Sequence, residues 1–523
     1  MKKIKIHNSE LIMKIDFQKI KYKKEIINFV EKISKDFPEA EVFLVGGTVR
    51  DILLKQTDQM DYDFLIRKVE AKKLEKFLNK LGKVNLVGKQ FGVFKFLPNT
   101  LIKTQKDSWD IALPRTEYSG NSGARADFNI QSDPNLSIQD DLSRRDFTIN
   151  SMALLLQATS YKLQAKLIDP FNGQDDLKKK IIKTAGNPEQ RFKEDYSRML
   201  RGIRFACQFN FKIEKKTWRA LKKLMLNINN VINGERLVPY ETIAKEFLKS
   251  FYCAPSLAFN LCDQSGIFKN LIPEILKMKK CPQPKKYHTE GDVWKHTKLA
   301  LLNLDSKKFK KQFKKEKNSI ELILATMFHD IGKPYTIKTP KKDEVDRIRF
   351  NNHDQIGAKL FKKICQRLKF SSVPNLKFET SKAVWLVVNH LLIFQEVEKM
   401  KNRTIEKYFF NEKYSGQDLL KLSFVDTLAT IPKNGKIVLT SFNKIIKRIK
   451  NLKKLNKEKN RLPKPILNGH EIIKKFNLCS GRQIGKLLEI LREAQLGGEV
   501  KNKKQAGEFL KKYLIKDPKI TDN

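Results

Sequence analysis

Two aspartates separated by a single residue are the densest candidate for chemistry in this sequence. Asp61 and Asp63 stand at the start of the strand-like run YDFLI, which ends at Ile66. Residues two apart in an extended strand project to the same face, so both carboxylates can hold common divalent ions. Asp110, in the strand-like WDIAL, is the candidate for a third carboxylate. Three such carboxylates fit a two-metal site, which stabilises the attacking and leaving oxygens of a phosphoryl transfer.

A candidate phosphate-binding turn precedes these aspartates. The strand-like VFLVGG ends at Gly46 and Gly47, and a helix is expected to begin near Thr48. Glycines at a strand-to-helix junction let backbone N–H groups approach a phosphate, and the helix N-terminus adds a favourable dipole. Arg50 lies in the first helical turn, and its guanidinium can form bidentate hydrogen bonds with the same phosphates. Each feature alone is more often structural, but their order along the chain favours a nucleotide site.

A second group of candidate ligands lies later in the chain. Five of the seven histidines fall between His288 and His390, and Asp330 directly follows His329. Imidazole with carboxylate suits several divalent transition metals, and helical bundles place such ligands inward from different helices. A bound ion lowers the pKa of water and yields a nucleophile for phosphoester hydrolysis. The pattern therefore predicts a metal site rather than unrelated core histidines.

The expected secondary structure changes along the chain from mixed strands and helices to mainly helices. Strand-like and helix-like segments alternate from 42 to about 155, with strands expected at 62–66, around 84, at 92–96 and at 109–113. The polar stretch 119–136 has little periodicity and predicts a mobile loop. Beyond about residue 189, amphipathic helical patterns dominate. The sequence therefore predicts an α+β head followed by a largely all-helical body.

The charge balance indicates a polyanionic partner. The 523-residue chain has 105 Lys and Arg against 58 Asp and Glu, a formal net charge of +47. A field of that sign attracts nucleic acid, although a Lys-rich proteome is an alternative source of the excess. Two basic runs, 305–317 and 444–461, are expected to be either solvated helix faces or sites that bind an RNA backbone. A chain of this length is expected to contain three or four modules.

Cysteine spacing and hydropathy indicate the cellular compartment in which the protein is expected to work. The six cysteines are scattered with no close pair, which argues against a disulfide framework or a thiolate zinc site. No run of about 18 apolar residues occurs, so no membrane span is expected. We therefore expect a cytoplasmic protein with no membrane association.

The head resembles the polymerase-beta-like nucleotidyltransferase superfamily, in particular bacterial class II CCA-adding enzymes and poly(A) polymerases. The stretch LVGGTVRDILLKQTDQMDYDFLI, 44–66, is similar to the first motif. DDLSRRDFTINSMAL, 140–154, is similar to the second, in which an arginine and an aspartate approach the nucleotide, here Arg145 and Asp146. IDPFNGQDDLKKKIIKT, 168–184, is similar to the flexible hinge motif, and FKEDYSRMLRGIRFA, 192–206, to the motif that selects the base.

This resemblance implies a role for each matching residue. Mg²⁺ is held by Asp61 and Asp63, and Asp110 assists deprotonation of the tRNA 3′ hydroxyl. Asp195 and Arg198 hydrogen-bond the Watson–Crick edge of CTP or ATP. Three further arginines face the triphosphate: Arg145, Arg201 and Arg204. The three-residue spacing of Asp195, Arg198 and Arg201 predicts that they share one helix face.

The histidine region resembles the HD superfamily of metal-dependent phosphohydrolases, because its His-Asp pair is followed by Gly-Lys-Pro. The resemblance implies four core ligands: His296, His329, Asp330 and Asp426. His353 and His390 are expected to complete a second metal position. The metal is expected to be a divalent transition ion of open identity. CCA-adding enzymes of one bacterial group carry such a domain and typical bacterial poly(A) polymerases lack it, which favours the tRNA enzyme.

The combined motifs predict a CCA-adding enzyme whose partners are tRNA, CTP and ATP. The stretch 465–500 resembles the tail of CCA-adding enzymes, which supports tRNA. Two alternatives stay open: a poly(A) polymerase or an enzyme that adds only CC or only A, and an RNA end phosphohydrolase with a non-catalytic palm. The first three expected parts are an N-terminal helical extension, 1–37, a polymerase-beta-like palm, 38–185, and a helical neck, 186–280. They are followed by an HD domain, 281–432, and a basic tail that binds tRNA, 433–523.

Overall fold

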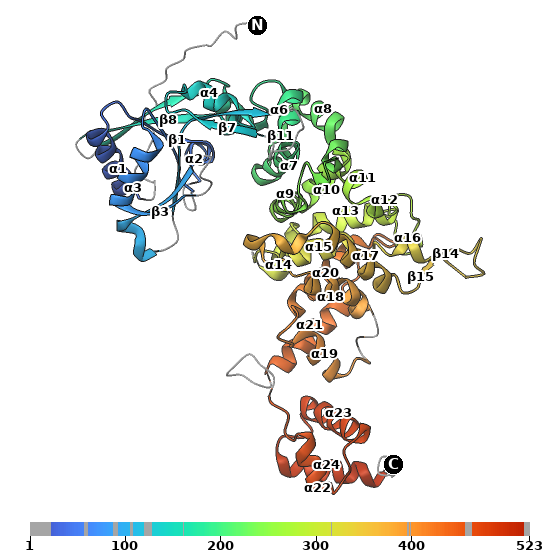
Figure 1. Cartoon of the computed structure of the whole chain (residues 1–523). Helices are drawn as coiled ribbons and strands as arrows, with labels where there is room; N and C mark the ends of the chain where they lie inside the picture. The colour runs from blue at the N-terminus through green and yellow to red at the C-terminus, as the bar shows by residue number, and fades with distance from the viewer. Residues whose placement is uncertain are drawn as a thin grey trace. The chain divides into compact units, whose positions relative to one another are not determined.

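A computed structural model of the chain divides into two compact units, Met1–Ile272 and Pro273–Asn523 (Figure 1). Each unit buries hydrophobic side chains of its own. The described residues are 22–56, 61–86, 93–104, 108–119, 128–159, 162–314, 316–394, 397, 399–454 and 463–516. Among these residues no helix has the length and apolar character needed to cross a bilayer. The predicted N-terminal extension lies outside the described residues up to residue 21.

A seven-stranded sheet with the order β3-β4-β5-β2-β1-β8-β9 forms the first unit's centre. Its strands are β1 Glu41–Val45, β2 Asp63–Arg67, β3 Gly82–Leu86, β4 Val93–Pro98, β5 Trp109–Ala112, β8 Ala153–Thr159 and β9 Lys162–Ile168. β2 and β5 run parallel, and the other neighbouring strands run antiparallel. In the parallel pair Asp63 lies opposite Asp110. The sheet thus brings two of the predicted carboxylates onto adjacent strands.

Helix α1, Lys23–Asp36, packs on this sheet through an aromatic core. The ring of Phe29 lies 5.4 Å from the rings of Phe64 and Trp109 and 5.7 Å from that of Phe96. All four side chains are buried. Apolar residues at helical spacing in α1 meet every second residue of the strands, which is why the two elements pack together. The packing fixes the strands that carry Asp63 and Asp110.

The prediction of a loop over 119–136 is wrong in part. β6, Arg115–Ser119, pairs antiparallel with β7, Phe128–Ser132. Residues 120–127 lie outside the described part of the chain. A ladder of this kind is held by backbone hydrogen bonds, so a polar composition with little periodicity does not exclude it.

Helices complete the first unit. They are α2 Gly47–Leu53, α3 Ala71–Leu81, α4 Ile138–Ser143, α5 Gly173–Lys179, α6 Pro188–Glu194, α7 Ser197–Phe209, α8 Lys215–Leu224, α9 Tyr240–Cys253, α10 Pro255–Ser265 and α11 Ile267–Leu271. The Asn187 side chain accepts the Gln190 backbone N–H and caps α6, which has proline in its first turn. α7 ends where Asn210 adopts the left-handed conformation. These caps set the boundaries of the segment that contains Asp195 and Arg198.

The second unit is helical around the histidines. Its principal helices are α13 Val293–Asn303, α15 Ile320–Phe328, α17 His353–Arg367, α18 Thr380–Asn389 and α20 Gly416–Ala429. α15 is apolar along almost its whole length and buried on nearly every side, as expected for a central helix. Ser319, Ser415 and Asp292 cap α15, α20 and α13 through their side-chain oxygens. Caps of this type begin each helix at a defined residue.

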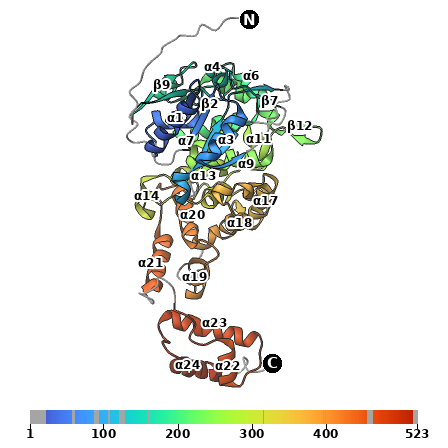
Figure 2. The ribbon, with the colours of Figure 1, turned by 60° about the vertical axis from the view of Figure 1, so that its left-hand side comes forward.

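The C-terminal helices form a small bundle (Figure 2). The bundle has a hydrophobic core of its own. Its helices are α22 Gly469–Phe476, α23 Arg482–Gly497 and α24 Lys503–Lys516. Leu487, Leu491 and Leu510 are buried in this core. The basic run predicted at 444–461 forms α21, Thr440–Lys454, as far as it is described.

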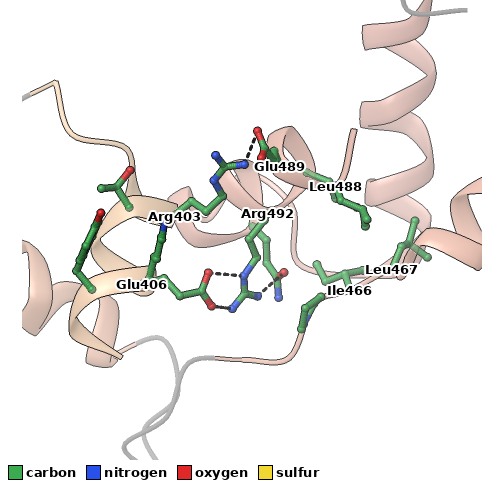
Figure 3. Close-up of a pocket in the computed structure, with 13 residues that line it drawn as sticks. Arg403, Glu406, Ile466, Leu467, Leu488, Glu489 and Arg492 are labelled. Atoms are coloured by element: carbon green, nitrogen blue, oxygen red, sulfur yellow. Dashed lines mark hydrogen bonds and ion pairs between the residues drawn. The ribbon is translucent and has the colours of Figure 1, made fainter. Parts of the chain in front are cut away.

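Ion pairs join this bundle to α19, Asn402–Phe409 (Figure 3). Arg492 forms a bidentate ion pair with Glu406, in which Arg492 Nε lies 3.0 Å from Glu406 Oε2. Arg403 pairs with Glu489 at 2.5 Å. The two pairs line a cavity of about 690 Å³ whose remaining wall includes Leu488 and Leu491. Charged contacts thus contribute to the attachment of the bundle.

Candidate active sites

A cleft of about 740 Å³ in the first unit contains all twelve residues expected to bind the nucleotide or its metal. They come from the turn before α2 and α2 itself, the segment that leads into β2, strands β2 and β5, the segment after α4, the residue at the end of α6, and α7. The residues are Gly46, Gly47, Arg50, Asp61, Asp63, Asp110, Arg145, Asp146, Asp195, Arg198, Arg201 and Arg204. The cleft therefore gathers side chains that are spread over more than half of the first unit's sequence.

The carboxylates of this cleft repel one another electrostatically. Burial raises the pKa of Asp63 to about 7, and the charges of Asp110 and Asp61 add to the effect while Arg145 opposes it. The pKa of Asp110 is also raised, chiefly by burial. Thr48 fixes the segment, because its hydroxyl donates to the Asp61 carbonyl at 2.8 Å and accepts the Asp63 N–H at 2.9 Å. Closely placed carboxylates with raised pKa values fit a divalent cation, whose charge would relieve the repulsion.

The predicted glycine turn lies against Arg145. Gly46 has a φ of +66°, and a Cβ built there would come within 2.6 Å of the Arg145 guanidinium. A side chain at this position would therefore be strained and would displace Arg145. Buried Asp141 accepts hydrogen bonds from Arg145 and from Arg144. Burial alone would raise the pKa of Asp141, but these two arginines hold it below its usual value.

Asp146 is the centre of a buried polar network. It accepts hydrogen bonds from Arg201 Nε at 2.7 Å and from the Asn150 amide at 3.0 Å. Although burial acts in the opposite direction, Arg201 and Asn150 hold the pKa of Asp146 well below its usual range. Arg50 also donates to Asn150, at 2.7 Å. Two arginines expected to contact phosphates are therefore oriented by side chains on the protein.

Arg204 has a partner that sequence reasoning did not find. It is paired with buried Glu246 on α9 at 2.5 Å, and its guanidinium lies 3.9 Å from the centre of the Phe205 ring. Glu246 follows Arg204 by a whole helix and a hairpin, so no local pattern marks it as a partner. Arg204 Nη1 also donates to Gln208, at 2.8 Å. Arg204 still lines the cleft and stays a candidate for a triphosphate contact.

The expected helical face holds for Arg198 and Arg201 but is wrong for Asp195. Asp195 lies between α6 and α7 with φ −151° and ψ 103°, which is extended backbone. Its carboxylate accepts the Ser197 backbone N–H at 2.8 Å and so satisfies a donor at the start of α7. Arg198 donates to Glu194 at 2.7 Å and to the Arg144 carbonyl at 3.1 Å. The two residues expected to read the base still line the same cleft.

Six predicted ligands converge in the second unit. They are His296 on α13, His329 and Asp330 after α15, His353 at the start of α17, His390 after α18, and Asp426 on α20. All six are buried. Asp330 connects them, because its Oδ2 lies 3.3 Å from His329 Nε2 and its Oδ1 lies 3.4 Å from His353 Nε2. The groups His296, His329, Asp330 and Asp330, His353, His390 each have ligand atoms within 4.8 Å of one another.

The protonation of these rings fits a metal centre. His353 and His390 each place Nδ1 2.7–2.8 Å from a backbone carbonyl, so Nδ1 carries a hydrogen and Nε2 is the nitrogen available to a metal. Their two Nε2 atoms nevertheless face each other at 3.3 Å. Burial lowers the pKa of His390 to about 4, with His329 adding to the shift. Two imidazole Nε2 atoms at this separation can both ligate one divalent cation, and buried His329 Nε2 also lacks a hydrogen-bond partner.

Two neighbours of this centre were missed by sequence reasoning. Glu290 Oε1 lies 2.9 Å from His296 Nδ1. The Lys333 ammonium lies 2.6 Å from Asp330 Oδ2 and also donates to Gln283 at 2.9 Å. Lys333 follows Asp330 by three residues, a spacing that places both on one side of a helical turn and is the signal by which it could have been found. Glu290 has no comparable signal beyond its closeness to His296 in the sequence.

Three segments of the chain match known protein families in the order of the structure. Residues 42–183 match the poly A polymerase head domain. Residues 210–278 match the family described as the probable RNA and SrmB-binding site of polymerase A. Residues 293–415 match the HD domain.

Relatives and solved structures extend the likeness over most of the chain. The multifunctional CCA protein of Aliivibrio salmonicida is 30% identical over 375 residues, which are 71% of this chain and 79% of that protein. The A-adding tRNA nucleotidyltransferase of Deinococcus radiodurans is 26% identical and covers 74% of this chain and 81% of its own length. The Bacillus stearothermophilus CCA-adding enzyme in complex with CTP shares the fold, with a TM-score of 0.58 at 17% identity over 95% of this chain and 98% of its own. The likeness of sequence over this length shows that the chain belongs to the family of tRNA nucleotidyltransferases with a poly A polymerase head and an HD domain.

Proposed function

We propose that this chain adds the CCA sequence to the 3′ end of tRNA from CTP and ATP, and that its HD domain is a metal-dependent phosphohydrolase. The observation that carries the first activity is the cleft in which the twelve expected residues meet. It supports nucleotide transfer because the cleft brings Asp61, Asp63 and Asp110 together with arginines that can bind phosphates. The cytoplasm, where tRNA is processed, is the compartment that this substrate implies.

The transfer follows from the groups in the cleft. Asp61 and Asp63 are positioned to hold Mg²⁺, which when bound stabilises the charge on the attacking and leaving oxygens. Asp110, whose pKa is raised chiefly by burial, accepts the proton of the tRNA 3′ hydroxyl. The hydroxyl oxygen then attacks the α-phosphorus of the nucleotide, and pyrophosphate leaves.

The arginines and Asp195 position the nucleotide for that attack. Arg145, held by Asp141, and Arg201, held by Asp146, neutralise the triphosphate. Asp195 and Arg198 supply acceptors and donors for the base edge, so protein side chains take the place of a template. Selection by such hydrogen bonds is effective because a mismatched base leaves buried polar groups unpaired.

Two narrower activities share the same cleft. A poly(A) polymerase and an enzyme that adds only CC or only A need the same groups, and the relative from Deinococcus radiodurans is named an A-adding enzyme. The test supplies tRNAs that lack three, two or one of the terminal nucleotides, with CTP and ATP separately and together. Extension of each tRNA to a complete CCA end, and no further, supports the proposal. Repeated addition of A, or arrest after CC, contradicts it.

The six convergent ligands support the hydrolase activity. Damaged tRNA that ends in a 2′,3′-cyclic phosphate or a 3′ phosphate lacks the free hydroxyl that the palm requires, so hydrolysis of such ends would restore a substrate. A protein with only this activity and a non-catalytic palm is disfavoured by the presence of Asp61, Asp63 and Asp110 in one cleft. The test is release of the cyclic phosphate from such an RNA end with each of several added divalent metals. Absence of hydrolysis with every metal contradicts the second activity.

The outer parts of the chain are assigned to RNA. We propose the neck, 186–280, for base selection and for RNA contact, and the tail, 433–523, for support of the tRNA. Helix α21 supports the second assignment because it carries lysines on its exposed side. Such residues bind phosphates without regard to sequence, so binding is expected to weaken steeply as salt rises.

A further inference from the structure

One of the four histidines at the HD centre is held differently from the other three. His329, His353 and His390 each place Nδ1 against the backbone carbonyl of the residue three positions earlier. A carbonyl accepts but does not donate, so each of these Nδ1 atoms carries a hydrogen. His296 instead donates from Nδ1 to Oε1 of Glu290, at 2.9 Å. The Nδ1 atom of His296 is therefore bound by an anionic side chain, whereas Nδ1 of each of the other three histidines is bound by a neutral backbone carbonyl.

Glu290 is fixed from two further directions. Its Oε1 also lies 2.6 Å from His288 Nδ1, and its Oε2 accepts the Ile431 backbone N–H at 3.0 Å. The carboxylate side chain is only 4% exposed. These contacts therefore replace the hydrogen bonds that water would make to the carboxylate, and they leave Glu290 little freedom to rotate. The ring of His296 that it binds is restricted in turn.

The contact with Ile431 links Glu290 to the helix that carries Asp426. Ile431 follows α20, and its carbonyl accepts both the backbone N–H and the hydroxyl of Thr289, at 2.8 and 2.9 Å. On the opposite side of the ring, His296 Nε2 lies 2.9 Å from Asp426 Oδ1. The imidazole is therefore placed between two carboxylates that belong to connected segments.

We propose that Glu290 is a positioning residue that directs the Nε2 lone pair of His296 at the metal position it shares with Asp426 and makes His296 the strongest imidazole donor of the centre. The inference rests on the proposed metal-dependent function of the HD domain. A carboxylate on the far nitrogen of a ligand histidine fixes its tautomer and increases its basicity. Loss of Glu290 then weakens the metal position built on His296 and spares the position built on His353 and His390.

The test is Co²⁺ binding by the full chain carrying Asp61→Ala and Asp63→Ala, so that the palm carboxylates do not contribute. Co²⁺ is the probe because its visible absorption reports nitrogen ligation and coordination geometry. Glu290→Gln and Glu290→Ala are introduced in this background. We expect Co²⁺ affinity to fall about 10-fold in the first and toward about 100-fold in the second, with an altered spectrum in both. One metal position is expected to keep the affinity of the parent.

Thr289→Val is the matched control, because it removes a contact of the same segment with Ile431 and leaves His296 untouched. It should bind Co²⁺ like the parent. Equal affinity and unchanged spectra in both Glu290 variants would overturn the inference, and so would a Thr289→Val protein that binds as weakly as Glu290→Ala, since the role would then be structural. A parent that binds no Co²⁺ contradicts the hydrolase function itself. If Glu290→Ala fails to fold by thermal unfolding, Glu290→Gln, which has the same shape, decides the result.

Discussion

Asp63 and Asp110 lie opposite each other on two parallel strands, although a helix and two further strands separate them in the sequence. Paired residues of neighbouring strands direct their side chains to the same face of a sheet. The backbone register, rather than any local motif, therefore makes these two carboxylates neighbours. Asp61, two residues before Asp63, adds its charge to the same place.

Asp61→Ala and Asp63→Ala are each expected to reduce nucleotide addition by about a thousandfold, because each removes an oxygen ligand from the catalytic metals. Neither residue is a hydrophobic core side chain, so folding should be retained. Incorporation of labelled CTP and ATP is the measurement. Asp36→Ala, which changes an exposed aspartate at the end of α1, outside the cleft, is the control and should keep normal activity. Near-normal rates in both palm variants contradict the assigned metal site.

The raised pKa of Asp63, about 7, predicts how pH and Mg²⁺ act on stability. In the unfolded chain this carboxyl ionises near pH 4, at about its ordinary pKa. Between these two values the folded protein keeps a proton that the unfolded chain has lost. The metal-free protein therefore loses stability as pH rises through this window.

Mg²⁺ binds the ionised carboxylate, so its effect on the melting temperature should grow from about pH 5 to about pH 8. The measurement is thermal unfolding with and without Mg²⁺ at both pH values. Asp63→Asn has no charge to titrate and should show a much flatter dependence. An Mg²⁺ effect of equal size at both pH values in the unaltered protein is incompatible with this explanation.

Asp195→Ala and Arg198→Ala are expected to reduce the preference for CTP and ATP over UTP and GTP by about tenfold, the effect of losing a buried hydrogen bond to the base. Competition among the four nucleotides is the measurement. Arg191→Ala is the matched control, because Arg191 also pairs with Glu194 but does not line the cleft. Unchanged selectivity in the two variants means that the base is recognised elsewhere.

Glu406→Gln should weaken the attachment of the C-terminal bundle by about 1–2 kcal/mol, because Glu406 and Arg492 are 26% and 11% exposed and form two charged hydrogen bonds (Figure 3). Glu489→Gln is the control. Its pair with Arg403 is 56% and 36% exposed, so the loss should be below about 1 kcal/mol. Hydrogen exchange of α23 measures both. Equal protection in the two variants would show that burial does not set the strength of these pairs.

Replacing His329 and Asp330 together by alanine should abolish phosphohydrolase activity and leave CCA addition largely intact. The reason is that both residues belong to the second unit, whereas the nucleotide cleft lies within the first. Both activities are measured on one preparation, with a cyclic-phosphate RNA end for the first and a tRNA lacking its terminal A for the second. Surviving hydrolysis by folded protein refutes the HD assignment. A collapse of CCA addition refutes the independence of the two sites.

Much of the head could be predicted because its signals are local. Alternating apolar residues mark strands such as β2 and β5, and the glycine pair marks the turn before α2. The His329-Asp330 pair followed by Gly-Lys-Pro is a local signal of the same kind. The fold class follows from such patterns, and the head and HD families follow from the resemblance of the motifs to known families. The comparisons confirm both.

The features that sequence reasoning missed have one local cause and one long-range cause. Asp195 has helical spacing with Arg198, but its carboxylate accepts the backbone N–H of Ser197, two residues later, and the residue is extended. Arg204 finds Glu246 on another helix, and Glu290 finds a backbone group at Ile431. A polar side chain carries no mark of a partner that is far along the chain, so only the folded structure identifies these pairs.

The division of the chain after Ile272 has a genetic consequence. All the candidate palm residues precede that point, and all the candidate HD ligands follow it. Two mutant alleles, one with a palm lesion and one with an HD lesion, should therefore complement each other when expressed in the same cell, since each product still supplies the step that the other lacks. Selection can likewise remove the hydrolytic step from a lineage without a compensating change in the polymerising one.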